Sequence, residues 1–237
     1  MGRMLFSIYR TDIFPPSAIS FVQNEALLNH LRTVISPDTM PLGTFNKTKD
    51  MDYDLNSVKA VFIEAGIASH LDDSLEIVKQ VRTVNQRACI FVLVTHPGTL
   101  SNVDYHIADA DYCIKLPGNE QDKTRLLVRA LNESRWNYAP VQLRLDRTKL
   151  RLCSATRTLE LTHTEMMILD TLLRAPHQIM SYEHLVKALA ATIVFYDPRA
   201  LEKAISRLRT KIKNAHQLKL ISSVRSFGYR LRRSSVY

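Results

Sequence analysis

The N-terminal part of the chain alternates short apolar runs with amphipathic stretches. Runs of strand length fall at residues 18–22, 39–45, 60–64, 89–95 and 111–114. Between the first two, Leu27, Leu31 and Val34 recur at the spacing of a helix with one apolar face. Strands that alternate with helices are typical of a parallel sheet covered on both faces. The pattern predicts an α/β domain after an extension of residues 1–17, with a last helix over residues 121–132.

After Pro140 the apolar residues alternate with polar ones. This period of two is typical of short antiparallel strands with one buried face, and it covers Val141, Leu143 and Leu145, then Leu150 and Leu152, then Leu159 and Leu161. Three helices follow. Thr162 and Glu165 have the spacing of a capping box before the first, Ser181 is a good N-cap for the second, and Pro198 suits the first turn of the third. Strands, three helices and a final hairpin predict a winged helix-turn-helix.

The third of these helices has two distinct faces at 100° per residue. Leu201, Ile205, Leu208 and Ile212 form a narrow apolar stripe that faces the core. The opposite side collects residues that can contact bases or phosphates, with Arg209 nearer the core edge: Arg199, Lys203, Ser206, Arg207, Arg209, Thr210 and Lys213. A solvated basic face is the alternative. The position of this helix in a helix-turn-helix, before a basic hairpin, favours DNA in a major groove.

The predicted hairpin is also rich in cations, namely Lys219, Arg225, Arg230, Arg232 and Arg233. Arg225 lies at its tip, where an arginine can enter a narrow minor groove or remain a solvated turn residue. Gly228 supplies the permissive backbone of a tight turn.

Charge separates the two parts of the chain. The 237 residues carry a formal charge of +9, but residues 1–134 hold 13 Lys and Arg against 16 Asp and Glu, whereas residues 135–237 hold 19 against 7. A basic module is expected to meet a polyanion. No apolar run has the length of a membrane helix, and the three cysteines lack metal-ligand or disulfide spacing. We therefore expect a cytoplasmic protein without membrane contact or cofactor.

The C-terminal motifs resemble a known family. The segments LELTHTEMMILDTLL, SYEHLVKAL, DPRALEKAISRLRTKI and ISSVRSFGYRL are similar to the effector domain of OmpR/PhoB-type response regulators. The resemblance implies that Arg199, Arg207 and Arg209 contact double-stranded DNA and that Arg225 is the wing arginine. Ser226 departs from the usual glycine, and Lys203-Ala204 replaces an apolar residue and a histidine. The loop 190–196 can touch RNA polymerase in the family; in this chain its apolar residues fit that role or packing within the domain.

The N-terminal domain resembles a receiver, a flavodoxin-like α/β fold. Thr95 and Lys115 occupy the positions of the switch threonine and lysine, although Leu116 separates Lys115 from Pro117. Glu64 stands where a receiver has its phosphorylated aspartate, and Gln23 and Asn24 replace its acidic pair. Phosphoryl transfer needs Mg²⁺ held by anionic oxygen ligands, so phosphorylation is not expected. One hypothesis is that Glu64 pairs with Lys115 and partly mimics phosphate; the other is an ordinary buried ion pair.

These observations predict a pseudo-receiver over residues 1–133, a linker over 134–140 and a winged-helix DNA-binding domain over 141–237. The resemblance also implies a homodimer through the face formed by roughly residues 99–107, 111–114 and 121–132. The chain lacks a glycine-rich phosphate loop or a positioned nucleophile, which argues against an enzyme. Two other functions remain open, a regulator that senses a small molecule at the ends of its strands and an adaptor that binds protein instead of DNA.

Overall fold

The N-terminal domain is a five-stranded parallel sheet with the strand order β2-β1-β3-β4-β5. We describe it in a computed structural model that covers residues 17–35, 42–44, 55–65, 71–95, 101–134, 136, 141–190 and 199–237. The strands are β1 Ala18–Phe21, β2 Leu42–Thr44, β3 Ala60–Ala65, β4 Cys89–Val94 and β5 Tyr112–Lys115. This order is that of the flavodoxin-like doubly wound fold, in which ligands meet the carboxyl ends of the strands. All five predicted strands are confirmed.

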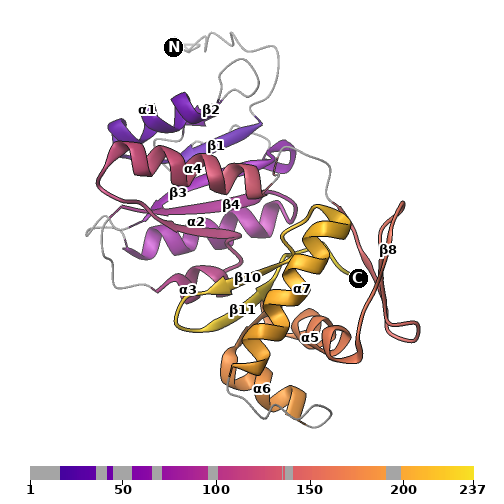
Figure 1. The fold of residues 1–237 in the computed structure, drawn as a ribbon. Helices are drawn as coiled ribbons and strands as arrows, with labels where there is room; N and C mark the ends of the chain where they lie inside the picture. Colours follow the sequence, from indigo (N-terminus) through magenta and orange to yellow (C-terminus); the bar gives the residue numbers. More distant parts are fainter. Residues whose placement is uncertain are drawn as a thin grey trace, which may run out of the picture.

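Helices cover both faces of this sheet (Figure 1). On one face, α1 Glu25–Val34 and α4 Glu120–Ser134 pack through Leu27, Leu31 and Leu127 against Phe62 and Phe91. The other face carries α2 Leu71–Val84 and α3 Asn102–Ile107, with the short 3-10 helix η1 Leu55–Ser57 at its edge. Successive side chains of β3 point to opposite faces, and all six of its residues are buried. This explains why its sequence is a continuous apolar run.

Two details of the domain differ from the expected boundaries. Helix α3 begins at Asn102, because Ser101 and Asp104 form a capping box that fixes its start. Helix α4 continues through Ser134, which was expected to open the linker. Trp136, which follows α4, is half-buried against the core that contains α1 and α4.

The C-terminal domain is a winged helix-turn-helix of the α+β class. A sheet of β6 Arg144–Asp146, β7 Arg151–Cys153 and β8 Thr158–Glu160 precedes α5 His163–Arg174. The turn η2 Pro176–Gln178, β9 Ile179–Ser181 and α6 Tyr182–Ala190 lead to α7 Ala200–His216 and the hairpin of β10 Ile221–Val224 and β11 Gly228–Leu231. β11 lies between β10 and β9, so the terminal hairpin extends a three-stranded antiparallel sheet.

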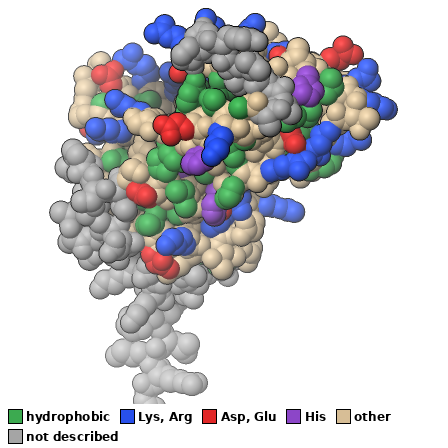
Figure 2. Space-filling model, turned by 90° about the horizontal axis from the view of Figure 1, so that it is seen from below, with side chains coloured by type: hydrophobic (Ala, Val, Ile, Leu, Met, Phe, Trp, Pro, Cys, Tyr) green, Lys and Arg blue, Asp and Glu red, His purple; other side chains and the backbone are tan. Residues whose placement is uncertain are grey.

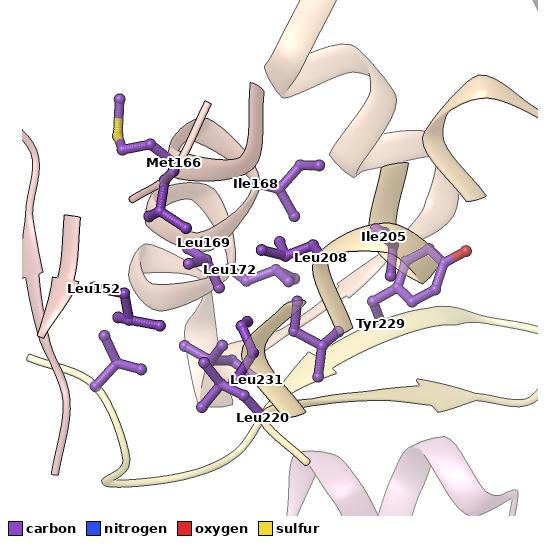
Figure 3. Packing of buried hydrophobic residues seen from close by; sticks show 14 of the residues in the cluster. Leu152, Met166, Ile168, Leu169, Leu172, Ile205, Leu208, Leu220, Tyr229 and Leu231 are labelled. Atoms are coloured by element: carbon purple, nitrogen blue, oxygen red, sulfur yellow. The ribbon is translucent and has the colours of Figure 1, made fainter. Parts of the chain in front are cut away.

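One apolar core joins these elements (Figure 3). Ile205 and Leu208 of α7 meet Leu169 and Leu172 of α5 and Leu231 of β11 in it, and these side chains are fully buried. The capping box of α5 is present, because the Thr162 hydroxyl accepts from the Glu165 backbone N–H and the Glu165 carboxylate accepts from the Thr162 N–H. The Ser181 hydroxyl likewise accepts from the His184 N–H at the start of α6. α7 begins two residues later than expected, and Pro198 lies outside the described residues.

Candidate nucleic-acid interface and receiver-like pocket

Helix α7 presents the two faces that its sequence predicts. Leu201, Ile205, Leu208 and Ile212 are at most 1% exposed and anchor the helix to the core. The side chains on the opposite face are exposed to solvent, and they comprise Arg199, Lys203, Ser206, Arg207, Thr210 and Lys213. The structure therefore brings six of the seven candidate residues of this helix together on one open surface. A rigid helix with one exposed basic side has the form that enters a major groove.

Arg209 is the seventh candidate, and it turns toward the hairpin instead. Its Nε donates to the Ile221 carbonyl at 3.0 Å, and its Nη2 donates to the Ser223 hydroxyl at 2.9 Å. The guanidinium also lies 5.5 Å from the ring centroid of Tyr229, within the range of a cation–π contact. Burial lowers the pKa of Arg209. Arg209 thus joins α7 to β10 and β11 and sets the angle between the helix and the wing.

The tip of the hairpin leaves Arg225 exposed beside Ser226. Ser226 has φ 57°, the left-handed conformation that explains why glycine is usual there. Gly228 serves a different purpose from the one expected. A Cβ on Gly228 would lie 2.2 Å from the Met180 carbonyl oxygen, so glycine is needed for the close approach of β11 to β9.

The other basic residues of the hairpin region contact the N-terminal domain. Arg232 Nη2 donates to the Ser134 carbonyl, Lys219 Nζ lies 2.5 Å from Glu133 Oε2, and Arg233 Nη1 lies 3.2 Å from Asp109 Oδ2. Arg230 is 3% exposed and donates to the Ala110 carbonyl. Figure 1 accordingly shows the hairpin between α3 and α7. Of the five cations that the sequence places in the hairpin region, these four therefore contact the N-terminal domain, whereas Arg225 remains on the surface.

Surface charge is unevenly distributed on the face of the molecule that Figure 2 shows. Figure 2 shows Lys and Arg side chains in an oblique row along one side of this face, while acidic side chains stand as isolated groups. Acidic residues of the C-terminal domain are used in local pairs, such as Asp170 with Arg147 and Arg174 and Glu165 with Lys211. These pairs neutralise cations that do not belong to the exposed basic side of α7.

Glu64 occupies the receiver-like pocket at the carboxyl end of β3. Its side chain is 8% exposed, and its Oε2 accepts the backbone N–H groups of Gln23 and Asn24, each at 2.9 Å. Asn24 is the N-cap of α1, so the carboxylate lies at the positive end of that helix. The Thr95 hydroxyl donates to Glu64 Oε1 at 3.4 Å and to the Ala65 carbonyl at 3.3 Å. Gln23, Asn24, Glu64 and Thr95 therefore form one cluster.

Lys115 does not join this cluster. It is exposed at the end of β5, and no ion pair links it to Glu64 among the described residues. The expected Glu64–Lys115 pair is thus wrong. The two backbone N–H groups and the helix N-terminus supply the positive potential that the lysine was expected to provide.

The cluster does not fit the Mg²⁺ that receiver chemistry requires. Glu64 is the only carboxylate of the cluster, and its Oε2 accepts two backbone N–H groups. The Asn24 side-chain oxygen accepts from the Leu27 N–H at 3.0 Å. Hard cations need several outward oxygen ligands with negative charge. In the part of the chain that the structure describes, no group of three or more His, Cys, Asp or Glu is placed to hold a metal. No helix there is both long and apolar enough to cross a membrane.

Sequence reasoning missed one polar centre, which lies between the two domains. His106 of α3 is 9% exposed, and its Nδ1 lies 2.9 Å from Arg230 Nη1. Burial, and then the charge of Arg230, lower the pKa of His106 to about 4. A histidine near the end of an amphipathic helix gives no local signal of this role, because its partner is 124 residues away.

Comparison with known proteins supports the class indicated by the fold. Residues 156–231 match the family model described as "Transcriptional regulatory protein, C terminal". The virulence transcriptional regulatory protein PhoP of Salmonella typhi is 23% identical over 217 residues, which cover 88% of this chain and 95% of PhoP.

Two solved structures are also similar to this chain. The C-terminal domain of the lantibiotic response regulator NsrR is 35% identical, and the match covers 38% of this chain and 89% of that domain with a TM-score of 0.35. The Thermotoga maritima response regulator DrrB, an OmpR/PhoB homologue, is 18% identical over 90% of this chain and 97% of its own, with a TM-score of 0.40. The strand order and element sequence, not these superpositions, establish the fold. The chain is thus similar to a transcriptional regulatory protein over most of its length, and residues 156–231 match the C-terminal domain of such proteins.

Proposed function

We propose that the protein is a sequence-specific transcription regulator that binds double-stranded DNA through α7 and Arg225. The observation that carries this proposal is the exposed row of Arg199, Lys203, Arg207 and Lys213 above a fully buried aliphatic stripe. Arginine can bond a guanine edge with two hydrogen bonds, and lysine or serine can reach phosphates or bases. Arg225 at the tip of the hairpin adds a minor-groove contact.

The proposed roles divide the candidate residues into two groups. Arg207, with Ser206 and Thr210 beside it, lies at the centre of the exposed face and reads bases or nearby phosphates. Arg199 and Lys213 lie toward the ends of α7 and contact the backbone of the duplex. Arg209 acts through Ile221 and Ser223 and is a positioning residue. The role of loop 190–196 toward RNA polymerase stays a prediction, because residues 191–198 lie outside the described part.

The test neutralises Arg207 and Arg225 together. A duplex selected from random sequence by the wild-type protein is titrated by fluorescence anisotropy at several salt concentrations. Loss of two contacts of about 1 kcal/mol or more each should weaken binding at least about 10-fold. The slope of log K against log salt should fall by about one for each of the two residues that contacts a phosphate. Unchanged affinity would refute the proposed interface.

Arg151→Gln is the matched control. Arg151 is exposed on β7, pairs with Glu160 across the strands at 3.2 Å, and is not one of the proposed DNA contacts. The control variant should bind the duplex as the wild type does. The same salt series separates DNA from the protein-adaptor function, because a protein partner would not give a steep salt dependence.

We also propose that the regulator acts without aspartyl phosphorylation. The carboxylate at the phosphorylation position is a glutamate that two backbone N–H groups and Thr95 hold inward, which leaves neither a free nucleophile nor a Mg²⁺ site. Treatment with acetyl phosphate and Mg²⁺ should therefore add no phosphoryl mass to the intact protein. Detection of one phosphoryl group within residues 60–65 would overturn this part of the proposal.

The proposed assembly is a homodimer through α3, β5 and α4. Ile107 of α3 is 46% exposed and Val128 of α4 is 40% exposed, so both offer apolar surface to such a contact. Val128→Glu should therefore shift the protein toward monomer in analytical ultracentrifugation. A matched Gln121→Glu change on the same helix should leave the association state unchanged. A wild type that stays monomeric at micromolar concentration contradicts the dimer.

A further inference from the structure

The two domains are held together by a compact polar contact around Arg230. We call the contacts of Arg230 and Arg233 with residues 106–111 the domain clasp. Arg230 is on β11, and its neighbour Tyr229 belongs to the core of the C-terminal domain. Because side chains alternate along a strand, Arg230 points to the opposite side, where the N-terminal domain covers it. The clasp thus pins the wing sheet to the segment between α3 and β5.

The contact between Arg230 and His106 depends on the protonation state of His106. Arg230 Nη1 donates to the carbonyls of Ala110 and Asp111, the latter at 3.3 Å, and it lies 2.9 Å from His106 Nδ1. Nδ1 can accept from Arg230 only when it carries no proton, because a proton on it would face the N–H of Arg230. Nδ1 also lies 3.1 Å from the Ala110 carbonyl. A protonated imidazole would donate to that carbonyl and compete with Arg230 for it.

Among the described residues, the two carboxylates near His106 already interact with other groups. Asp111 Oδ2 already accepts from Arg82 Nη2 at 2.7 Å and from the Ile90 N–H at 2.9 Å. Asp109 Oδ2 lies 3.2 Å from Arg233 Nη1 and 3.4 Å from His177 Nδ1. The charged groups around His106 therefore comprise Arg230 from β11, Arg233 after β11, Arg82 from α2, His177 from η2, and Asp109 and Asp111 from its own segment.

Arg230 itself is only partly satisfied. Within the described residues its Nε and Nη2 have no hydrogen-bond partner, and Nη2 lies 3.9 Å from Asp109 Oδ1, beyond hydrogen-bond distance. A buried guanidinium that depends on a few acceptors is sensitive to the loss of any one of them. Protonation of His106 would remove one acceptor and add a like charge in the same step.

We propose that the domain clasp is a pH-sensitive switch, in which protonation of His106 expels Arg230 and separates the wing sheet from the N-terminal domain. The direction follows from linkage. Burial and Arg230 lower the pKa of His106 to about 4 in the closed form, whereas a released histidine has a value of about 6.5. The contribution of neutral His106 to the clasp is therefore complete above pH 6.5 and is lost as the pH falls toward 4.

The size of the effect follows from the same two values. When the pH falls from 7 to 5, the ratio of open to closed protein should rise roughly 20-fold.

The experiment measures the radius of gyration of the full-length protein by small-angle X-ray scattering from pH 7.5 to pH 5. Forward scattering gives the mass at each pH, so that association is separated from opening. Wild type should expand as the pH falls. In His106→Gln, the amide oxygen can accept from Arg230 but does not titrate in this pH range. This variant should therefore stay compact to a lower pH than the wild type. Arg230→Ala should be expanded at every pH, and His177→Gln should still open in acid.

Several results would overturn the proposal. The first is that the wild type and His106→Gln expand equally in acid. The second is that the wild type stays compact at pH 5 while Arg230→Ala is expanded. The third is that Arg230→Ala is compact at every pH. The ring signals of His106 in the intact protein give an independent check by NMR. A His106 pKa near 6.5 in the closed protein would show that the imidazole is not held under Arg230. None of these measurements uses DNA, so the switch and the proposed DNA-binding function can fail independently.

Discussion

Removal of the Glu64 carboxylate should destabilise the N-terminal domain, because it leaves two amides at the start of α1 without their acceptor. Hydrogen bonds to a charged group contribute about 1.5–3 kcal/mol each, and a carboxylate at a helix N-terminus adds about 0.3–1 kcal/mol. Gln23 and Asn24 are exposed, so water replaces part of the loss when the acceptor is gone. We therefore expect Glu64→Ala to lower the free energy of unfolding by about 2–3 kcal/mol.

Glu64→Gln separates charge from hydrogen bonding. Its amide oxygen can accept the same two N–H groups as a neutral acceptor, so the loss should be about 1 kcal/mol. Glu76→Ala is the matched control on α2, where Glu76 is exposed and only accepts from Gln80 at 3.3 Å. Removal of such a surface contact should change the stability by less than about 0.5 kcal/mol.

Urea denaturation followed by tryptophan fluorescence provides the assay. Trp136 is the only tryptophan of the chain, and it packs against the core that contains α1, so its emission reports on the N-terminal domain. With a slope of about 1–3 kcal/mol per molar urea, Glu64→Ala should lower the midpoint by about 1–2 M. A midpoint that moves no further than that of Glu76→Ala would refute the view that this carboxylate organises the pocket.

Two further predictions concern the wing. Gly228→Ala should lower the stability of the C-terminal domain by about 1–3 kcal/mol in thermal unfolding, because the new Cβ would lie 2.2 Å from the Met180 carbonyl oxygen. A variant as stable as the wild type would show that β9 and β11 do not approach so closely. Arg209→Met keeps the apolar stem but loses the bonds to Ile221 and Ser223, which should cost about 1–3 kcal/mol and weaken DNA binding without changing the salt slope. A change in that slope would instead indicate that Arg209 contacts a phosphate.

Local sequence was sufficient for the secondary structure and for the two faces of α7. The apolar spacing of Leu201, Ile205 and Leu208 depends only on the period of a helix, and the capping box of Thr162 and Glu165 involves residues three apart. Both could be recognised because the interacting groups belong to the same turn or the same helix. The exposed cations of α7 followed from the same periodicity.

The roles of Arg209, Arg230, His106 and Glu64 were decided only by tertiary structure. Glu64 meets Gln23 and Asn24 across 41 and 40 residues, and Arg230 meets His106 across 124. In the sequence, Arg230 and Arg225 are both cations of the predicted hairpin; in the fold, Arg230 is 3% exposed and Arg225 lies on the surface. Charge and periodicity predict which residues are polar and which face of an element is apolar. They do not predict which distant backbone group meets a side chain, because that depends on how the sheets and helices pack.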